Sequence, residues 1–184
     1  MAEQALAGLR VIDLSTVLAG PNCARYLGDF GADVIKIETP QGDTTRDIGP
    51  SRTKRMGSYF ATLNRNKRSL AIDLKKPAAM RALLHLIDGA DVVVHNMRAG
   101  AAQRLGLDYA SLVKRNPKLV YASAGGFRQD SSLRDFPAYD DLIQGLSGIA
   151  SLNAGPDGAP RYFPMVAVDK LTGANLASMI GMAL

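Results

Sequence analysis

The sequence contains no tryptophan, a single cysteine and few aromatic residues. One cysteine, Cys23, excludes a disulfide within the chain and is typical of a reducing compartment, so we expect a cytoplasmic protein. No apolar run is long enough to span a bilayer, and the N-terminal stretch MAEQALAGLR lacks the charged and apolar regions of a signal peptide. We therefore expect no membrane segment.

Two motifs of common binding sites are also missing. No G-x-G-x-x-G follows the first predicted strand, which weakens a nicotinamide dinucleotide site, although Glu38 lies about where a ribose-binding acid belongs. The simpler interpretation of Glu38 is a surface acid at a strand end. His85 and His95 have no Cys or His at metal-ligand spacing, so we expect no metal and predict two packed or half-exposed histidines.

The sequence has fewer acidic than basic residues. The 17 Asp and Glu against 22 Lys and Arg give a net charge of +5. The basic residues gather loosely between Arg46 and Arg68. They form either a solvated surface or a site for a phosphate-bearing ligand. Without aromatic interleaving or a nucleic-acid motif, we expect no nucleic-acid partner.

Residues 9–38 contain the pattern around which the chain is organised. Arg10–Leu14 predicts a buried strand, the stretch from Pro21 carries apolar residues on one helical face, and Asp33–Glu38 predicts a second strand. Strand, helix and strand within about 30 residues indicate a βαβ unit with a right-handed crossover.

The alternation continues along the chain and favours an open, mostly parallel α/β sheet with flanking helices, a Rossmann-like fold. Ligands bind such sheets beyond the carboxyl ends of the strands. The further predicted strands are Ser69–Leu74, Asp91–His95 and Leu119–Ala124, and the predicted helices are Ser58–Leu63, Pro77–Ile87, Gly100–Leu105, Tyr109–Arg115, Tyr139–Leu146 and Asp169–Leu184.

Asp169 follows the apolar stretch Val166–Val168 and starts the last predicted helix. Its side chain either caps that helix, since Asp is a favoured N-cap, or serves as a carboxylate nucleophile held at the positive helix end. Spacing does not choose between the two. The helix reaches Leu184 without a capping residue, and we expect a truncated polypeptide.

Six segments, in this order, carry a resemblance: LRVIDLSTVLAGPNCARYLGDFGADVIKIETPQGD, YFATLNRNKRSLAIDLKKPAAM, ADVVVHNMRAGAAQRLGLDY, NPKLVYASAGGF, PAYDDLIQGLSGIASLNAGPDGAP and VAVDKLTG. The chain resembles the N-terminal portion of the family III coenzyme A transferases, the group of formyl-CoA and carnitine CoA-transferases. The resemblance implies an enzyme that moves CoA between carboxylic acids through a covalent aspartyl intermediate, with Asp169 as the nucleophile. Acyl-CoA and an acceptor acid would be its substrates, with no tightly bound cofactor.

The resemblance also places CoA-binding positions on seven residues of this chain. Lys75 and Arg104 suit phosphate groups by their charge, and Tyr139 is expected to orient the substrate. The seven CoA-binding positions are Val17, Ala19, Leu74, Lys75, Asn96, Met97 and Arg104.

Two alternatives stay open. The same fold serves α-methylacyl-CoA racemases, which act by proton transfer, but Tyr139 stands where their histidine would be, and a tyrosine titrates too high for that role. A non-catalytic CoA-binding fragment is the second alternative. Family members are longer and form interlocked homodimers, so we expect residues 1–184 to be the CoA-binding domain of a protein whose smaller second domain is absent here.

Overall fold

The structure is a computed structural model and describes residues 4–184. Its strands are β1 (Arg10–Asp13), β2 (Asp33–Glu38), β3 (Lys67–Ala71), β4 (Val92–His95) and β5 (Val120–Ser123). Its helices are α1 (Ala19–Asp29), the short 3₁₀ helix η1 (Thr44–Asp47), α2 (Ser58–Leu63), α3 (Pro77–Asp88), α4 (Ala99–Leu105), α5 (Tyr109–Arg115), α6 (Asp140–Leu146), α7 (Ile149–Leu152) and α8 (Ala167–Ala183).

The five strands form one sheet in the order β3-β2-β1-β4-β5, and every neighbouring pair is parallel. This arrangement confirms the predicted α/β fold with an open parallel sheet. The chain reverses its direction of travel across the sheet between β1 and β4. Ligands bind doubly wound sheets at such a switch point, beyond the carboxyl ends of the strands.

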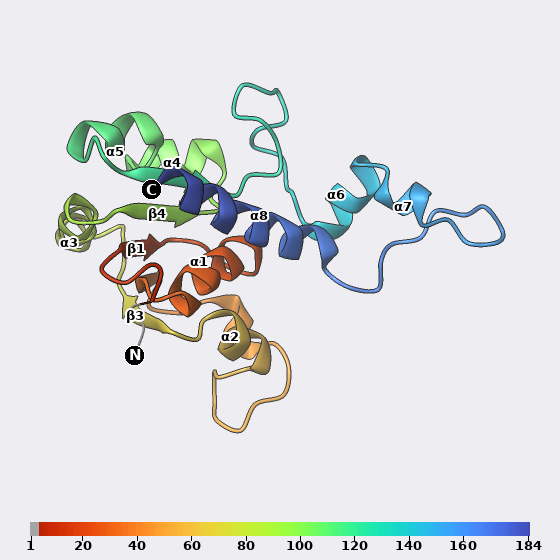
Figure 1. Cartoon of the computed structure of the whole chain (residues 1–184), viewed down its shortest axis with the longest axis horizontal. Helices are drawn as coiled ribbons and strands as arrows, with labels where there is room; N and C mark the ends of the chain where they lie inside the picture. The colour runs from red at the N-terminus through yellow and green to blue at the C-terminus, as the bar shows by residue number, and fades with distance from the viewer. Residues whose placement is uncertain (1–3) are drawn as a thin grey trace.

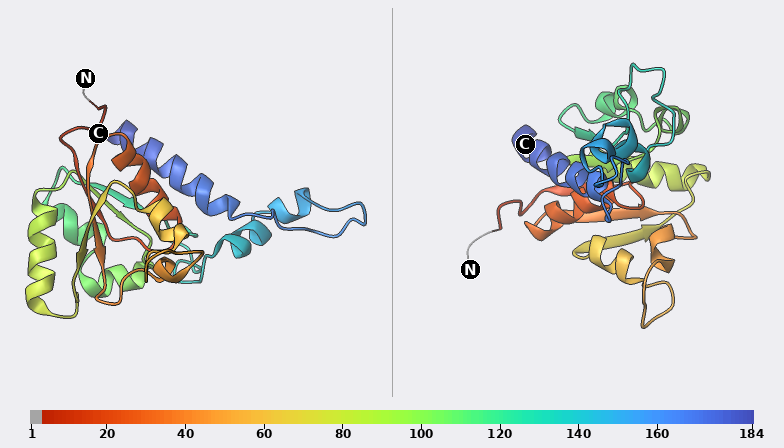
Figure 2. Two further views of the ribbon diagram at one scale, coloured as in Figure 1. Left: turned by 90° about the horizontal axis from the view of Figure 1, so that it is seen from below. Right: turned by 90° about the vertical axis from the view of Figure 1, so that its right-hand side faces the viewer.

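Helices cover both faces of the sheet, as Figures 1 and 2 show. Helices α1 and α8 lie on one face, where Cys23, Leu27 and Ile180 pack against β1, β2 and β4. On the other face Leu83, Ile87 and neighbours from the α3–α5 region cover the opposite side chains of the same strands. Because both faces are covered, β4 consists of three buried valines followed by a buried histidine.

Within the basic stretch between Arg46 and Arg68, Lys67 is buried in an ion pair instead of facing solvent or a ligand. The side chain of Lys67 is 1% exposed, and its Nζ lies 2.8 Å from Asp13 Oδ2 at the end of β1. Nζ also donates to the carbonyl oxygen of Pro21 and to Asn64 Oδ1. Burial lowers the pKa of Lys67, and Asp13 opposes that shift. Lys67 therefore links β3 to β1 through a buried ion pair.

Glu38, expected as a surface acid, is buried. Arg46 donates two hydrogen bonds to its carboxylate, at 2.6 and 2.8 Å, and Ser69 donates a third. Burial alone would raise the pKa of Glu38, but the hydrogen bonds from Arg46 and Ser69 lower it to about 2. With its oxygens committed to these donors, Glu38 is unsuited to a ribose.

Several predicted boundaries were wrong by a few residues. Strand β3 runs from Lys67 to Ala71 instead of from Ser69 to Leu74, and α1 begins at Ala19 instead of Pro21. The last helix begins at Ala167, and its N-cap residue is Val166. Asp169 is therefore the third helical residue and not the N-cap, which removes one of its two interpretations.

Helix α8 crosses α1 at a glycine. A Cβ atom on Gly173 would lie 2.6 Å from the carbonyl oxygen of Ala19 and 2.9 Å from Asn22 Cβ, so only glycine fits there without a shift. Asn22 also donates a hydrogen bond to the carbonyl oxygen of Lys170. Because Asp169 lies one helical turn before Gly173, this crossing places the carboxylate over the start of α1.

The segment with α6 and α7 projects from the body of the molecule before the chain returns into α8 (Figures 1 and 2). Within residues 4–184, no helix has both the length and the apolar character needed to cross a membrane.

We predict that Gly173→Ala destabilises the fold or displaces α8, because the new methyl group meets backbone at the crossing. Gly181→Ala in the same helix is the matched control, since its Cβ would meet nothing within 4 Å. The control should gain about 0.5–1 kcal/mol from helix propensity. Urea unfolding measures both, and a gain for Gly173→Ala equal to that of the control would contradict the prediction.

Candidate functional site

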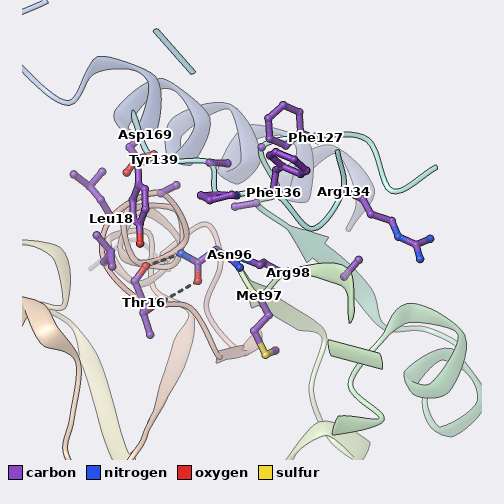
Figure 3. A pocket seen from close by; sticks show the side chains of 18 of the residues that line it. Thr16, Leu18, Asn96, Met97, Arg98, Phe127, Arg134, Phe136, Tyr139 and Asp169 are labelled. Carbon is purple, nitrogen blue, oxygen red and sulfur yellow. Dashed lines mark hydrogen bonds between the residues drawn. The ribbon is translucent and has the colours of Figure 1, made fainter. Parts of the chain in front are cut away.

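A cleft of about 240 Å³ opens at the carboxyl edge of the sheet, above the switch point between β1 and β4. The β1–α1 loop, the segment after β4, the loop after β5 and the first turn of α8 enclose it (Figure 3). Six of the residues predicted from sequence line this cleft: Val17, Ala19, Asn96, Met97, Tyr139 and Asp169.

Asn96 fixes the loop that forms one wall of the cleft. Its Oδ1 accepts the Thr16 backbone N–H at 2.9 Å, and its Nδ2 donates to the Thr16 carbonyl oxygen at 2.7 Å, as the dashed lines in Figure 3 mark. The next residue, Val17, has φ of 68°, a left-handed conformation that is strained for a β-branched residue. At the wall of the cleft, both ends of the Asn96 amide thus hold a strained loop.

Buried charges hold the same loop from beneath. Lys36 Nζ donates to the Ser15 carbonyl oxygen at 2.9 Å, and the Ser15 N–H donates to Asp13 Oδ1 at 3.0 Å. The Lys36 side chain is 1% exposed and lies 3.1 Å from Asp43 Oδ2. Residues of β1 and β2 therefore fix the loop before it reaches the cleft.

Asp169 lies in the first turn of α8 and is partly buried. Burial, and then the nearby charge of Asp140, raise the pKa of Asp169 to about 6. At neutral pH the carboxylate is mostly ionised and more basic than an exposed aspartate. That combination suits a nucleophile or a general base.

Two residues that were not identified from the sequence hold Asp169 in place. Asp140 Oδ1 accepts the Asp169 backbone N–H at 2.9 Å, and Gln144 Nε2 donates to Asp140 Oδ2 at 2.5 Å. Gln144 Oε1 also accepts the Phe163 N–H. Both side chains come from the buried face of α6, so α6 anchors the start of α8. Their spacing of four residues predicts a shared helix face, but not its partner.

Two tyrosines bear on the site in different ways. Tyr139 lines the cleft and is largely exposed. Tyr59, on α2, was not identified from sequence; burial, followed by the charges of Asp169 and Asp140, raises the pKa of its phenol. The phenol of Tyr59 therefore stays protonated at neutral pH and keeps its O–H as a hydrogen-bond donor.

Leu74 and Lys75 lie beside a neighbouring cavity of about 320 Å³, together with Glu38 and Thr39. Met97 lines both this cavity and the cleft. The structure thus divides the predicted binding residues between two adjoining hollows on one edge of the sheet.

Arg104 lines neither hollow; it lies exposed in the last turn of α4. Two other arginines, Arg98 and Arg134, do line the cleft. In the view of Figure 3, Arg134 lies at the end opposite Asp169 and Tyr139. The sequence offered no local signal for Arg98 and Arg134, because their loops carry no periodic pattern.

Two other candidate chemistries find little support. Among residues 4–184, no group of three or more His, Cys, Asp or Glu side chains could hold a metal ion. Cys23 is buried in the core, as predicted, and burial, followed by the charge of Asp13, raises the pKa of its thiol to about 12. Such a thiol is a poor nucleophile at neutral pH.

The fold and the cleft together define the class of this protein. It is a doubly wound α/β protein with a partly buried carboxylate over its ligand-binding edge. Residues 6–184 match the profile of CoA-transferase family III. The chain belongs to this family.

Similar proteins include two bacterial enzymes. The succinate–glutarate CoA-transferase of Agrobacterium fabrum is 42% identical over 97% of this chain and 46% of its own length. The acetyl-CoA:oxalate CoA-transferase of Acetobacter aceti is 42% identical over 95% of this chain and 43% of its own length. The chain therefore spans less than half the length of these relatives.

Solved structures agree with the fold. A CAIB/BAIF family protein from Brucella suis superposes with a TM-score of 0.93 at 38% identity, covering 99% of this chain and 49% of that one. The protein Rv3272 of Mycobacterium tuberculosis gives a TM-score of 0.88 at 34% identity, covering 97% of this chain and 49% of that one.

We predict that Asn96 and Val17 are energetically coupled. Asn96→Ala should lower the free energy of unfolding by about 1 kcal/mol, because it removes two hydrogen bonds that hold the strained loop. In a Val17→Gly background the loss should be smaller, since glycine adopts a positive φ without strain. A double-mutant cycle by urea unfolding measures the coupling. Strict additivity of the two changes would contradict this role.

We also predict that Asp169→Asn stabilises the fold by about 1 kcal/mol at pH 7, a value reduced for partial solvation. The folded-state pKa lies above the ordinary 3.8, so ionisation disfavours the folded state. The difference in the free energy of unfolding between Asp169→Asn and the unchanged protein should shrink as the pH falls from 6 towards 4. Unfolding at several pH values checks this. Asp130→Asn is the control: Arg128 lowers the pKa of Asp130, so its small effect should have the opposite sign. If Asp169→Asn raised the free energy of unfolding by the same amount at every pH, the prediction would be refuted.

Proposed function

We propose that this chain forms the CoA-binding half of a CoA-transferase in which Asp169 is the nucleophile. The observation that carries the proposal is the position of Asp169: a partly buried carboxylate in the same cleft as the β1–α1 loop and the residues after β4. Membership in CoA-transferase family III and the names of the relatives support CoA transfer as the reaction.

The proposed reaction has balanced steps. A carboxylate oxygen of Asp169 attacks the thioester carbonyl of an acyl-CoA, and the C–S bond breaks to give a mixed anhydride and CoA thiolate. The thiolate then attacks the Asp169 carbonyl carbon, releasing the first acid and leaving an aspartyl-CoA thioester. A second carboxylate repeats the two exchanges in reverse and takes the CoA. Covalent catalysis of this kind divides one difficult exchange into easier ones.

The surrounding residues suit these steps. Asp140 and Gln144 fix the start of α8, so the carboxylate needs little reorganisation before attack. Tyr139 lines the same cleft as Asp169, where its phenol can contact the substrate. Val17, Ala19 and Met97 offer a surface for the pantetheine arm, and Leu74 and Lys75 offer an adjoining cavity for the nucleotide end.

Two of the predicted contacts take a different form in this proposal. Asn96 acts through the Thr16 backbone, because both ends of its amide are engaged there. Because Arg104 lines neither hollow, in this proposal it contacts CoA phosphates that lie outside both of them.

A racemase working by proton transfer is less well supported. It needs a second acid or base beside the substrate, and His95 is buried and lines a different cavity. We also propose that the longer protein is an interlocked homodimer that works in the cytoplasm on acyl-CoA and a carboxylic acid. The free, buried Cys23 is consistent with a reducing compartment.

Intact-protein mass after mixing with a panel of acyl-CoAs tests the proposal, on this chain and on its longest natural reading frame. We predict an acyl- or CoA-sized adduct that Asp169→Ala abolishes and that Asp141→Ala, an exposed acid of α6, retains. Adduct formation should fall as the pH drops below about 6, because Asp169 becomes protonated.

An adduct that persists in Asp169→Ala would overturn Asp169 as the nucleophile. Exchange of the α-proton of a branched acyl-CoA in deuterated water, without any adduct, would favour the racemase. An adduct on the long form alone would mean that these residues bind CoA but need the remaining half for the reaction.

A further inference from the structure

Three cationic side chains of the basic stretch have no role in the reaction steps above. Arg52, Lys54 and Arg55 lie in the loop between η1 and α2, and all three are exposed. Among the ion pairs of residues 4–184, none includes any of the three. They line an open hollow of about 260 Å³, in which Asp47 is the one acidic residue. The loop therefore presents accessible positive charge to solvent.

Hydrogen bonds give this loop a defined shape. The Ser58 N–H donates to the Pro50 carbonyl oxygen at 3.0 Å. Arg46, which is ion-paired with Glu38, also donates from Nη1 to the Arg55 carbonyl oxygen at 3.4 Å. Arg55 has φ of 61°, a left-handed conformation that favours glycine over other residues. An arginine in such a conformation indicates a use for its side chain.

The guanidinium of Arg55 lies at the wall of the cavity beside Leu74 and Lys75. Its Nη2 donates to the Gln41 carbonyl oxygen, and a Cβ atom on Gly42 would lie 3.0 Å from the same nitrogen. Gly42 in turn lines the cavity. Because a guanidinium carries five N–H donors, this bond leaves others for a ligand at the rim of the cavity.

The cavity itself supplies little net positive charge. Of its five charged lining residues, Lys36 and Asp43 form an ion pair, and Glu38 is paired with an arginine outside the lining. The two that remain, Asp73 and Lys75, have opposite charges. The nucleotide end of CoA carries a pyrophosphate and a 3′-phosphate, and such a monoester alone brings about 1.5–2 negative charges at neutral pH. A cation at the rim would compensate that charge.

The order of the strands indicates which phosphate would lie near Arg55. Met97, which lines both the cleft and the cavity, follows β4, whereas Gln41 and Gly42 follow β2. Strand β1 lies between these two strands. In CoA the pyrophosphate joins the pantetheine arm to the ribose. An arm that enters past Met97 therefore places the pyrophosphate first and the 3′-phosphate of the ribose farther on, towards Gln41 and Arg55.

We propose that Arg55 binds the 3′-phosphate of CoA and so makes the protein select CoA over 3′-dephospho-CoA. Arg52 and Lys54 add positive charge around the same hollow. This inference rests on the proposed function, because it needs the nucleotide end of CoA in the cavity of Leu74 and Lys75. Arg55 was not among the CoA-binding positions expected from the sequence.

Isothermal titration calorimetry of the longest natural reading frame with CoA and with 3′-dephospho-CoA tests the inference. We expect the unchanged protein to bind CoA about tenfold more tightly, the effect of a charge-assisted hydrogen bond at an exposed site. Arg55→Gly should weaken CoA binding by about that factor and leave 3′-dephospho-CoA binding unchanged. Lys118→Ala removes an exposed cation just before β5 and should leave both affinities unchanged.

Urea unfolding separates a ligand contact from a structural role. Glycine adopts the positive φ of Arg55 without strain, so Arg55→Gly should not lower the midpoint of unfolding. A purely structural role for Arg55 would instead lower the midpoint and weaken the binding of both ligands alike.

Three results would overturn the inference and leave the proposed transfer reaction standing. One is equal affinity of the unchanged protein for the two ligands. Another is an equal loss of affinity for both in Arg55→Gly. The third is unimpaired CoA binding by that variant. If neither ligand bound the unchanged protein, the proposed CoA site itself would be overturned, and this inference with it.

Discussion

The close crossing of α1 and α8 at Gly173 is the contact on which the site depends. Because a side chain there would meet the carbonyl oxygen of Ala19, glycine lets two helix backbones approach until Asp169 lies over the β1–α1 loop. The carboxylate and the loop belong to opposite ends of the sequence. Their meeting is a consequence of helix packing on one face of the sheet, with Asp140 of α6 completing the anchor.

Buried charge is the second constraint. Lys67 pairs with Asp13, and Lys36 pairs with Asp43, both beneath the loop that ends in Val17. Replacing such pairs by apolar residues is often neutral for stability, so their value here lies in fixing geometry. They hold the backbone of the loop in place while Asn96 holds it from the side, which lets Val17 keep a strained conformation at the edge of the cleft.

Sequence reasoning succeeded where the signal was local or periodic. The βαβ unit, the run of valines in β4 and the apolar face of α3 each predicted the observed element, and motif order predicted the family. It failed for Glu38 and Lys67, because burial of a charge depends on a partner such as Arg46 or Asp13 that no local pattern identifies. The boundary of α8 was also misplaced, since an aspartate in a first turn resembles an N-cap.

The sequence by itself determined the alternation of strands and helices, hence the parallel sheet and its ligand-binding edge, because both follow from hydrophobic periodicity and connection handedness. Only the tertiary structure decided what each polar side chain does. Asn96 bonds the backbone of Thr16, 80 residues earlier, and His95 lies beside Ser123 across two strands. Such pairings depend on strand order and helix crossing, which bring distant residues within hydrogen-bonding distance and which no short segment encodes.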